Sequence, residues 1–294
     1  MSSIVSEFFE ITTVMDLLKS EGLLFLLSTT IVMYVAKKTY NLMSSFDLVQ
    51  ELTGHDNKAI SLSFAGYMFG VGLIQFGLLT SPAKEGINLW MEIGTTMVWG
   101  LVGIILLLIA QLVNDKILMH SFDNTKEIVQ DRNVGTGAVE CGSFIGSALM
   151  INAALSGDDY GFVTSLTTTL IYFVMGQVGF TIFGFIYCKV LRFDVHDEIE
   201  KDNASAGVSY GFNLVAIGLL LSGFIKYSDS LLGFFIWLLF AVLLMLSCRY
   251  LVDKYILPGD LLDEEVTKDQ NWGASLIEGA SALATAFIVN GAFF

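Results

Sequence analysis

The sequence predicts an all-α membrane protein with about eight transmembrane helices in two tandem four-helix modules. Three observations support this fold class. Hydrophobic residues make up 54% of the 294-residue chain and charged residues only 15%, whereas soluble domains usually carry about 25% charged residues. Eight stretches are long and apolar enough to cross a bilayer, which takes roughly 20 residues each. Finally, the stretches recur as an internal repeat of helical hairpins.

The amino-terminal residues 1–21 are expected to form an interfacial amphipathic segment, because Ile4, Phe8, Ile11 and Met15 share one helical face. The spans follow this segment. They are predicted at residues 22–38, 58–80, 88–112, 134–155, 162–188, 204–226, 230–249 and 272–294.

The linkers predict the orientation. With eight spans, the four longer linkers (37–58, 114–133, 189–203 and 249–271) fall on one side of the membrane and hold twelve of the fifteen Lys and Arg residues. Positively charged residues stay cytoplasmic. We therefore expect the four linkers in the cytoplasm and both termini on the external side of the membrane.

Each long linker ends in an acidic stretch followed by an asparagine that opens the next helix. Asparagine is among the best helix N-cap residues. The four N-cap asparagines recur every 68 to 76 residues, so each repeat is one hairpin and all repeats point the same way through the membrane. This spacing predicts two modules, 22–155 and 162–294, related by a pseudo-twofold axis along the membrane normal. The N-caps are Asn57, Asn133, Asn203 and Asn271.

Small residues mark the helices that the asparagines open. Nine and thirteen residues after the asparagine come Gly66 and Gly70 in the first repeat, Gly142 and Gly146 in the second, and Ala280 and Ala284 in the fourth. The third repeat has Phe212 and Ala216 instead. Such pairs let membrane helices approach closely. We therefore expect these helices inside the bundle and the Leu- and Phe-rich helices against lipid.

These asparagine-led helices, such as Asn57-Lys-Ala-Ile-Ser-Leu-Ser-Phe-Ala-Gly66 and Asn271-Trp-Gly-Ala-Ser, resemble those of the YjfL family of bacterial inner-membrane proteins. The resemblance covers nearly the whole chain beyond the first twenty residues, as a tandem duplication of the four-helix unit. That family is a domain of unknown function. The resemblance therefore implies fold, location and topology, and it implies no activity or catalytic residue.

Glu140 and Glu278 are the strongest candidates for a functional site. Each lies seven residues after its asparagine, about 10 Å into the helix, and carboxyl groups within a membrane usually face the bundle interior and mark function. The equivalent positions of the other repeats, and the positions one turn further along, carry mostly polar side chains. We expect a central polar ring made of Glu140, Ser143, Tyr210, Asn213, Glu278, Ser281 and Tyr67.

The ring favours a channel or transporter for a cation, a proton or another small solute. Two alternatives stay open: the glutamates lock the modules together through hydrogen bonds, or they are merely exposed near the cytoplasmic edge. A different class of function is a non-conducting scaffold or envelope-stress component, whose acidic linkers recruit a cytoplasmic protein. A homo-oligomer is compatible with either function.

Several classes of function are not expected. The net charge of −14 argues against nucleic-acid binding, which needs clustered Lys and Arg. The sequence has no zinc-protease motif, nucleophile elbow or phosphate-binding glycine loop. We therefore expect neither an enzyme nor a metal centre or cofactor.

Overall fold

The computed structural model describes residues 14–81, 86–156 and 161–294, and within them it has helices and no strand. Eight helices are long and apolar enough to span a membrane. The all-α class is therefore confirmed. These helices are α3 (Glu21–Met43), α4 (Lys58–Thr80), α5 (Leu89–Val113), α7 (Val134–Leu155), α8 (Phe162–Val190), α10 (Ala204–Tyr227), α11 (Leu231–Leu251) and α13 (Trp272–Phe293).

Short helical elements connect the spans. Two of them are π-helical extensions, which lengthen α5 to Leu118 and α11 to Ile256. The amino-terminal residues 1–13 of the predicted interfacial segment lie outside the described residues, and its end forms α2. The short elements are α2 (Val14–Lys19), η1 (Gln50–Gly54), η2 (Asn114–Leu118), α6 (Asn124–Lys126), η3 (Glu127–Asp131), α9 (Val195–Glu200), η4 (Val252–Ile256) and α12 (Leu262–Thr267).

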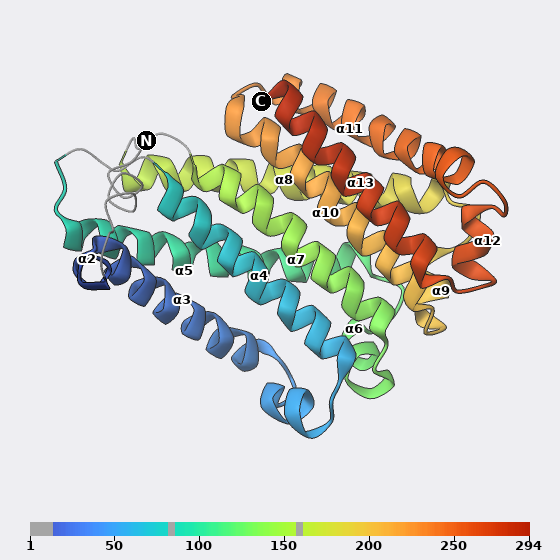
Figure 1. Ribbon diagram of the computed structural model, residues 1–294, viewed down its shortest axis with the longest axis horizontal. Helices are drawn as coiled ribbons and strands as arrows, with labels where there is room; N and C mark the ends of the chain where they lie inside the picture. Colours follow the sequence, from blue (N-terminus) through green and yellow to red (C-terminus); the bar gives the residue numbers. More distant parts are fainter. Residues whose placement is uncertain (1–13, 82–85, 157–160) are drawn as a thin grey trace.

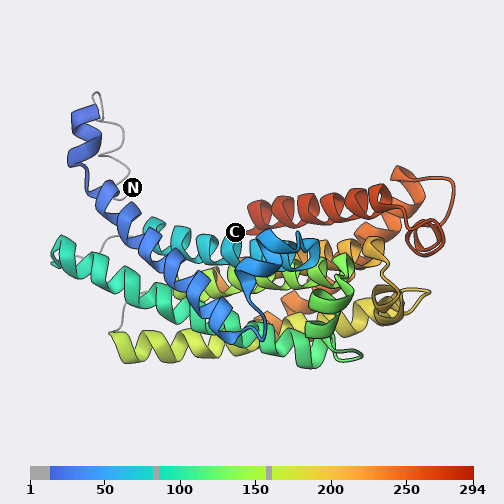
Figure 2. The same ribbon diagram turned by 90° about the horizontal axis from the view of Figure 1, so that it is seen from below.

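The four asparagine-led helices pack side by side in the order α4, α7, α10, α13 (Figure 1). The other four spans pack against this row, with α8 beneath it in Figure 2. Of the apolar stretch of each helix, 72% is buried in α7 and in α10, against 39% in α4 and 22% in α13. Thus α7 and α10 form the centre of the row, and α4 and α13 form its two ends.

The duplicated arrangement is confirmed, but the inner helices do not close into a ring around an axis. A closed ring would bring α4 against α13, whereas among the described residues these helices share no substantial interface. The two modules instead meet where α7 packs on α10.

The small residues allow very close helix packing at the centre of the row. A Cβ atom on Gly142 would overlap the backbone of Gly211 in α10, and one on Gly218 would overlap the backbone of Gly146 in α7. In the same way, Gly66 of α4 lies against the backbone of Cys141 in α7. Because lipid tails are as apolar as the side chains, this close backbone contact holds the helices together where the hydrophobic effect cannot.

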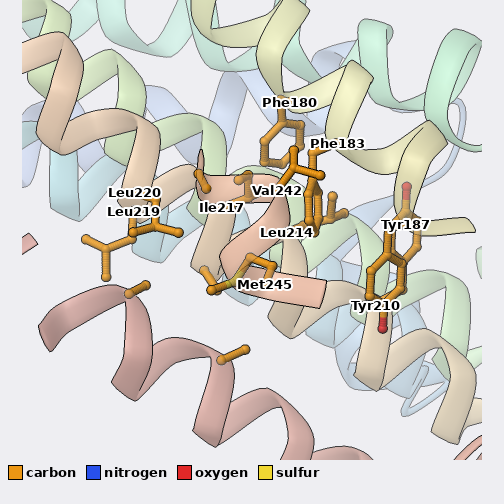
Figure 3. Close-up of a cluster of buried hydrophobic side chains, with 14 of the residues drawn as sticks. Phe180, Phe183, Tyr187, Tyr210, Leu214, Ile217, Leu219, Leu220, Val242 and Met245 are labelled. Atoms are coloured by element: carbon orange, nitrogen blue, oxygen red, sulfur yellow. The ribbon is translucent and has the colours of Figure 1, made fainter. Parts of the chain in front are cut away.

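Apolar side chains fill the space between the row and the outer helices in two clusters, one mainly in each half of the chain. The cluster in the second half includes Phe180 and Phe183 of α8 and Leu214 of α10 (Figure 3). At one end of this cluster, Tyr187 and Tyr210 stack with ring centroids 5.6 Å apart. These aromatic residues lie beside the polar groups described next.

Candidate buried carboxyl sites

Each N-cap asparagine starts its helix by accepting a backbone hydrogen bond. The Asn57 side chain accepts from the amides of Ala59 and Ile60. Asn133, Asn203 and Asn271 accept from the amide three residues on. The residue before each asparagine has a left-handed backbone, with φ between 47° and 62°, and this turns the linker into the helix. The four residues in this conformation are Asp56, Arg132, Asp202 and Gln270.

The side-chain amides of these asparagines tie neighbouring repeats together. Asn57 donates to the Ile128 carbonyl (2.8 Å), Asn133 to the Ile199 carbonyl (2.5 Å) and Asn203 to the Val266 carbonyl (2.9 Å). Each amide also donates to a linker glutamate of its own repeat. These acceptors are Glu51, Glu127, Glu198 and Glu265.

Two of these linker glutamates have opposite pKa shifts. Burial pushes the pKa of Glu51 up, but hydrogen bonds from Asn57 and His55 outweigh it and hold the pKa below its usual value. For Glu127, burial dominates over the hydrogen bond from Asn133, and the pKa is raised. Both carboxyl groups accept a hydrogen bond from an N-cap asparagine. Protonation of either glutamate therefore changes the hydrogen bonding at the start of a helix.

Glu278 in α13 lies in a fully partnered cluster. It is 1% exposed, and it accepts hydrogen bonds from Ser209 (2.6 Å) and Asn213 (3.2 Å) of α10 and from Tyr187 of α8 (2.9 Å). The Arg249 guanidinium of α11 forms an ion pair with it. Asp263 of α12 binds the other side of that guanidinium at 2.6 Å. The negative charge of Glu278 is therefore neutralised inside the helix bundle.

Glu140 in α7 lies in a sparser cluster. It is 2% exposed and accepts a 2.5 Å hydrogen bond from Ser63 of α4. The Tyr40 hydroxyl of α3 lies 3.1 Å from the Ser63 hydroxyl. No cationic side chain of the described residues forms an ion pair with Glu140. The position that corresponds to Arg249, counted from the asparagine, holds Gln111.

The two clusters follow one plan with different chemistry. Ser63 and Ser209 are each six residues after their asparagine, and Tyr40 and Tyr187 each lie near the end of the preceding outer helix. In each module the glutamate of the second inner helix meets the serine of the first. The second module adds the Arg249 cation to its glutamate, serine and tyrosine. In the first module, no cation of the described residues joins them.

The structure does not assemble the expected single ring, because α10 lies between α7 and α13 in the row. Asn213 contacts Glu278 directly. Tyr67 lies in the Glu140 cluster, with its ring 5.0 Å from that of Tyr40, and donates to the Ala36 carbonyl. Tyr210 reaches the Glu278 cluster by stacking on Tyr187. Ser143 is buried and Ser281 half-buried, and no hydrogen bond joins either side chain to a glutamate within the described part of the chain.

Sequence reasoning missed the hydroxyl and guanidinium groups that surround these carboxyl groups. The repeated register of Ser63 and Ser209 was a usable signal, since both follow their asparagine by six residues. Arg249 was counted with a linker because it lies at the end of an apolar stretch. The missed residues are Tyr40, Ser63, Tyr187, Ser209 and Arg249.

Comparison with known proteins places both clusters within matched regions. A family model described as Domain of Unknown Function (DUF350) matches the chain in two segments, residues 12–155 and 161–293. The chain is also 26% identical over 248 residues to a UPF0719 transmembrane protein of Aquifex aeolicus (strain VF5), covering 81% of this chain and 87% of that protein. No solved structure matches the chain. The match therefore confirms a duplicated unit from a membrane family without an assigned function.

Proposed function

Because the chain belongs to the DUF350 family, as a tandem pair of its units, we propose that it is a bacterial inner-membrane protein that binds and exchanges a proton or small cation at Glu140. The observation that carries this proposal is the difference between the two glutamates. Glu278 pairs with Arg249, whereas the only hydrogen-bond donor to Glu140 among the described residues is the Ser63 hydroxyl. We also propose that this membrane family is the YjfL family, which the asparagine-led helices resemble.

The chemistry of the Glu140 cluster suits a group that changes its protonation state. A carboxyl group held by hydroxyl groups can take up or release a proton while Ser63 and Tyr40 rotate to donate or accept. If Glu278 lost its charge, the Arg249 guanidinium would stay buried with one acidic partner fewer, which is costly. Glu140 is therefore the exchange site in this proposal, and Glu278 serves the packing of the second module.

The proposed orientation places this exchange near the cytoplasmic side. Without the buried Arg249 of α11, eleven of the fifteen Lys and Arg residues lie in or beside the four long linkers, and such residues stay cytoplasmic. Glu140 lies about two turns into the helix that starts from one of these linkers. Both termini are then periplasmic, and the protein acts without catalysis.

Flux into liposomes tests the proposal. The purified protein is reconstituted, and proton and monovalent-cation uptake is followed for wild type, Glu140→Gln and Ser143→Ala. Ser143 is the matched control, because it is buried on the same helix one turn away and has no hydrogen bond to the carboxyl group. We expect flux in wild type and Ser143→Ala and its loss in Glu140→Gln. Absence of flux from folded wild-type protein, or normal flux in Glu140→Gln, would overturn the proposal.

The second candidate function is a non-conducting scaffold that recruits a cytoplasmic protein. The observation that favours it is a recurring exposed carboxylate near each N-cap. These residues are Asp56, Asp131, Asp202 and Asp269. Reversing them to lysine should release a partner that crosslinks to the wild-type linkers, and the reconstituted wild-type protein should show no flux. Failure to find a linker-dependent crosslink would count against this function.

A further inference from the structure

The inner helices use one packing interface three times. Counting from each N-cap asparagine, register position 2 of one helix meets register position 4 of the next, and position 9 meets position 8. The position 2 to 4 pairs are Ala59 with Gly137, Gly135 with Gly207, and Ser205 with Ser275. The position 9 to 8 pairs are Gly66 with Cys141, Gly142 with Gly211, and Phe212 with Gly279. An interface that joins two different faces in this way is heterologous, and it continues until something closes or blocks it.

A polar contact repeats at the far end of the helices. The Asn152 amide of α7 donates to the Leu73 carbonyl of α4 at 2.6 Å, and the Asn290 amide of α13 donates to the Leu219 carbonyl of α10 at 2.7 Å. Asn152 and Asn290 are both at register position 19. In the two junctions within the modules, α4–α7 and α10–α13, the relation between neighbouring helices therefore extends to their far ends.

Both ends of the row expose the faces that this interface uses elsewhere. On α13 the forward face, at positions 2, 9, 13 and 20, is exposed and has no neighbouring helix within the described part of the chain. On α4 the receiving face, at positions 4, 8, 15 and 19, is open as well, and no described atom lies within 4 Å of a Cβ placed on Gly72. The forward face is Gly273, Ala280, Ala284 and Gly291, and the receiving face is Ser61, Ala65, Gly72 and Phe76.

The hydrogen bond from an N-cap asparagine to the linker of the next repeat is incomplete at both ends of the row. Among the described residues, it lacks an acceptor at Asn271 and a donor at the first linker. Asn57, Asn133 and Asn203 each donate to a carbonyl of the following repeat, but the Asn271 amide donates only to Glu265 among the described residues. In the first repeat, the Leu52 carbonyl corresponds by register to the Ile128 and Val266 carbonyls. No side-chain amide of the described residues donates to it. A second copy would supply Leu52 to Asn271.

An apolar pocket lies where the next module would begin. Trp99 of α5 packs on Phe162, the first residue of α8 in the second module, with ring centroids 5.4 Å apart. Trp237 of α11 has the same register as Trp99, since each lies 34 residues before its asparagine. Trp237 lines an open apolar pocket of about 410 Å³, which the other lining residues Phe224, Gly233, Ile236, Phe240 and Phe293 complete.

We propose that a second copy of this chain binds at this end, with its α4 on α13 of the first copy, in the same membrane orientation. This junction would repeat the features of the junction between α7 and α10. Small residues would pack on small residues, Asn271 would donate to the Leu52 carbonyl, and an aromatic contact would form at Trp237. The contact is heterologous, so copies add head to tail into a ring or a linear array.

Cysteine crosslinking tests the register of the junction. Ala280 at position 9 should meet Ala65 at position 8 of the next copy, so Ala65→Cys and Ala280→Cys are made in a background in which Cys141, Cys188 and Cys248 are alanine. Oxidation of the two single variants mixed in one membrane should give a covalent dimer. Each variant oxidised alone should give none, because the two faces differ. No dimer from the mixture, or dimers from either variant alone, would overturn the proposal.

A large side chain on the open face of α4 tests whether the copies associate through this face. Gly72→Phe should reduce the wild-type oligomer to single copies, because position 15 is packed in the internal junctions, where Ala148 is fully buried. Ile105→Phe is the matched control, since Ile105 of α5 is 57% exposed and away from both faces. Subunits are counted by single-molecule photobleaching in bilayers. If Gly72→Phe fails to fold, Ala284→Phe on the opposite face makes the same test. A monomeric wild type, or an unchanged subunit number in the folded face variants, would overturn the proposal.

Discussion

Arg249 of α11 forms a buried ion pair with Glu278 of α13, and the corresponding glutamate of the first module, Glu140 of α7, has no cation beside it among the described residues. The two modules thus keep one frame of glutamate, serine and tyrosine, and differ at the position of Arg249 and Gln111. In the proposed function, this difference separates the Glu278 carboxylate, which serves packing, from the Glu140 carboxyl group, which exchanges a proton or cation.

The two glutamates should differ in their effect on stability. Glu278→Gln removes the charge opposite Arg249, and breaking a buried pair costs about 3–5 kcal/mol. Glu140→Gln keeps an oxygen that can accept from Ser63, so it should cost less than about 1 kcal/mol. Reversible unfolding of both variants in detergent micelles measures the two losses. Similar losses would show that the ion pair does not stabilise the second module.

The N-cap asparagines should also differ, because only three of them bridge to the next repeat. Asn133→Ala loses the cap and the hydrogen bond to the Ile199 carbonyl, which keeps its bond from the Asp202 amide. The two losses together cost about 1.5–2.5 kcal/mol. Asn271→Ala loses its cap and a contact within its own repeat, at about 1 kcal/mol. Thermal unfolding of dilute, single-copy protein compares the variants. Equal losses would mean that the bridge to Ile199 adds nothing.

The sequence predicted the helix starts and the repeat well, because both depend on local chemistry. An asparagine after an acidic linker specifies its N-cap whatever the surroundings are. The small residues nine and thirteen positions on meet a neighbouring helix in α4 and α7, whereas Ala280 and Ala284 of α13 are exposed. The arrangement of the repeats could not be read in the same way. Whether four similar interfaces close depends on a small rotation per repeat, and no single residue encodes it. The expected ring of Glu140 and Glu278 failed for that reason.

The candidate sites show the same limit at the level of single residues. The glutamates were predicted as a buried pair from their matched register, but their partners come from helices whose rotation the sequence leaves undetermined. Ser63 and Ser209 could have been found from their common register. Arg249 could not be placed in the bundle from composition, since one arginine at the end of an apolar stretch is typical of a membrane-interface residue.

Glycines that look alike in the sequence should tolerate substitution very differently. Gly142→Val should cost about 3 kcal/mol or more, because its side chain would overlap the Gly211 backbone and the two helices would have to separate. Gly94→Val is the matched control, since no described atom lies within 4 Å of a Cβ there, and it should change stability by less than about 1 kcal/mol. Unfolding in detergent compares the two. Tolerance of Gly142→Val would contradict the close contact between α7 and α10.

The linker carboxyl groups should give stability changes of opposite sign with pH. The folded-state pKa of Glu51 lies below its ordinary value of 4.5, so its charged form contributes stability that is present above that value and is lost as the pH falls through the folded pKa. Glu127 has a raised folded-state pKa, so the wild type gains stability relative to a non-titrating variant as the pH falls through that pKa towards 4.5. As the pH falls from neutral to about 4.5, the stability of wild type relative to Glu127→Gln should rise. Below about pH 4.5, the stability of wild type relative to Glu51→Gln should fall. Chemical unfolding at a series of pH values measures both differences, and slopes of the same sign would contradict the opposite roles of burial and hydrogen bonding at the two caps.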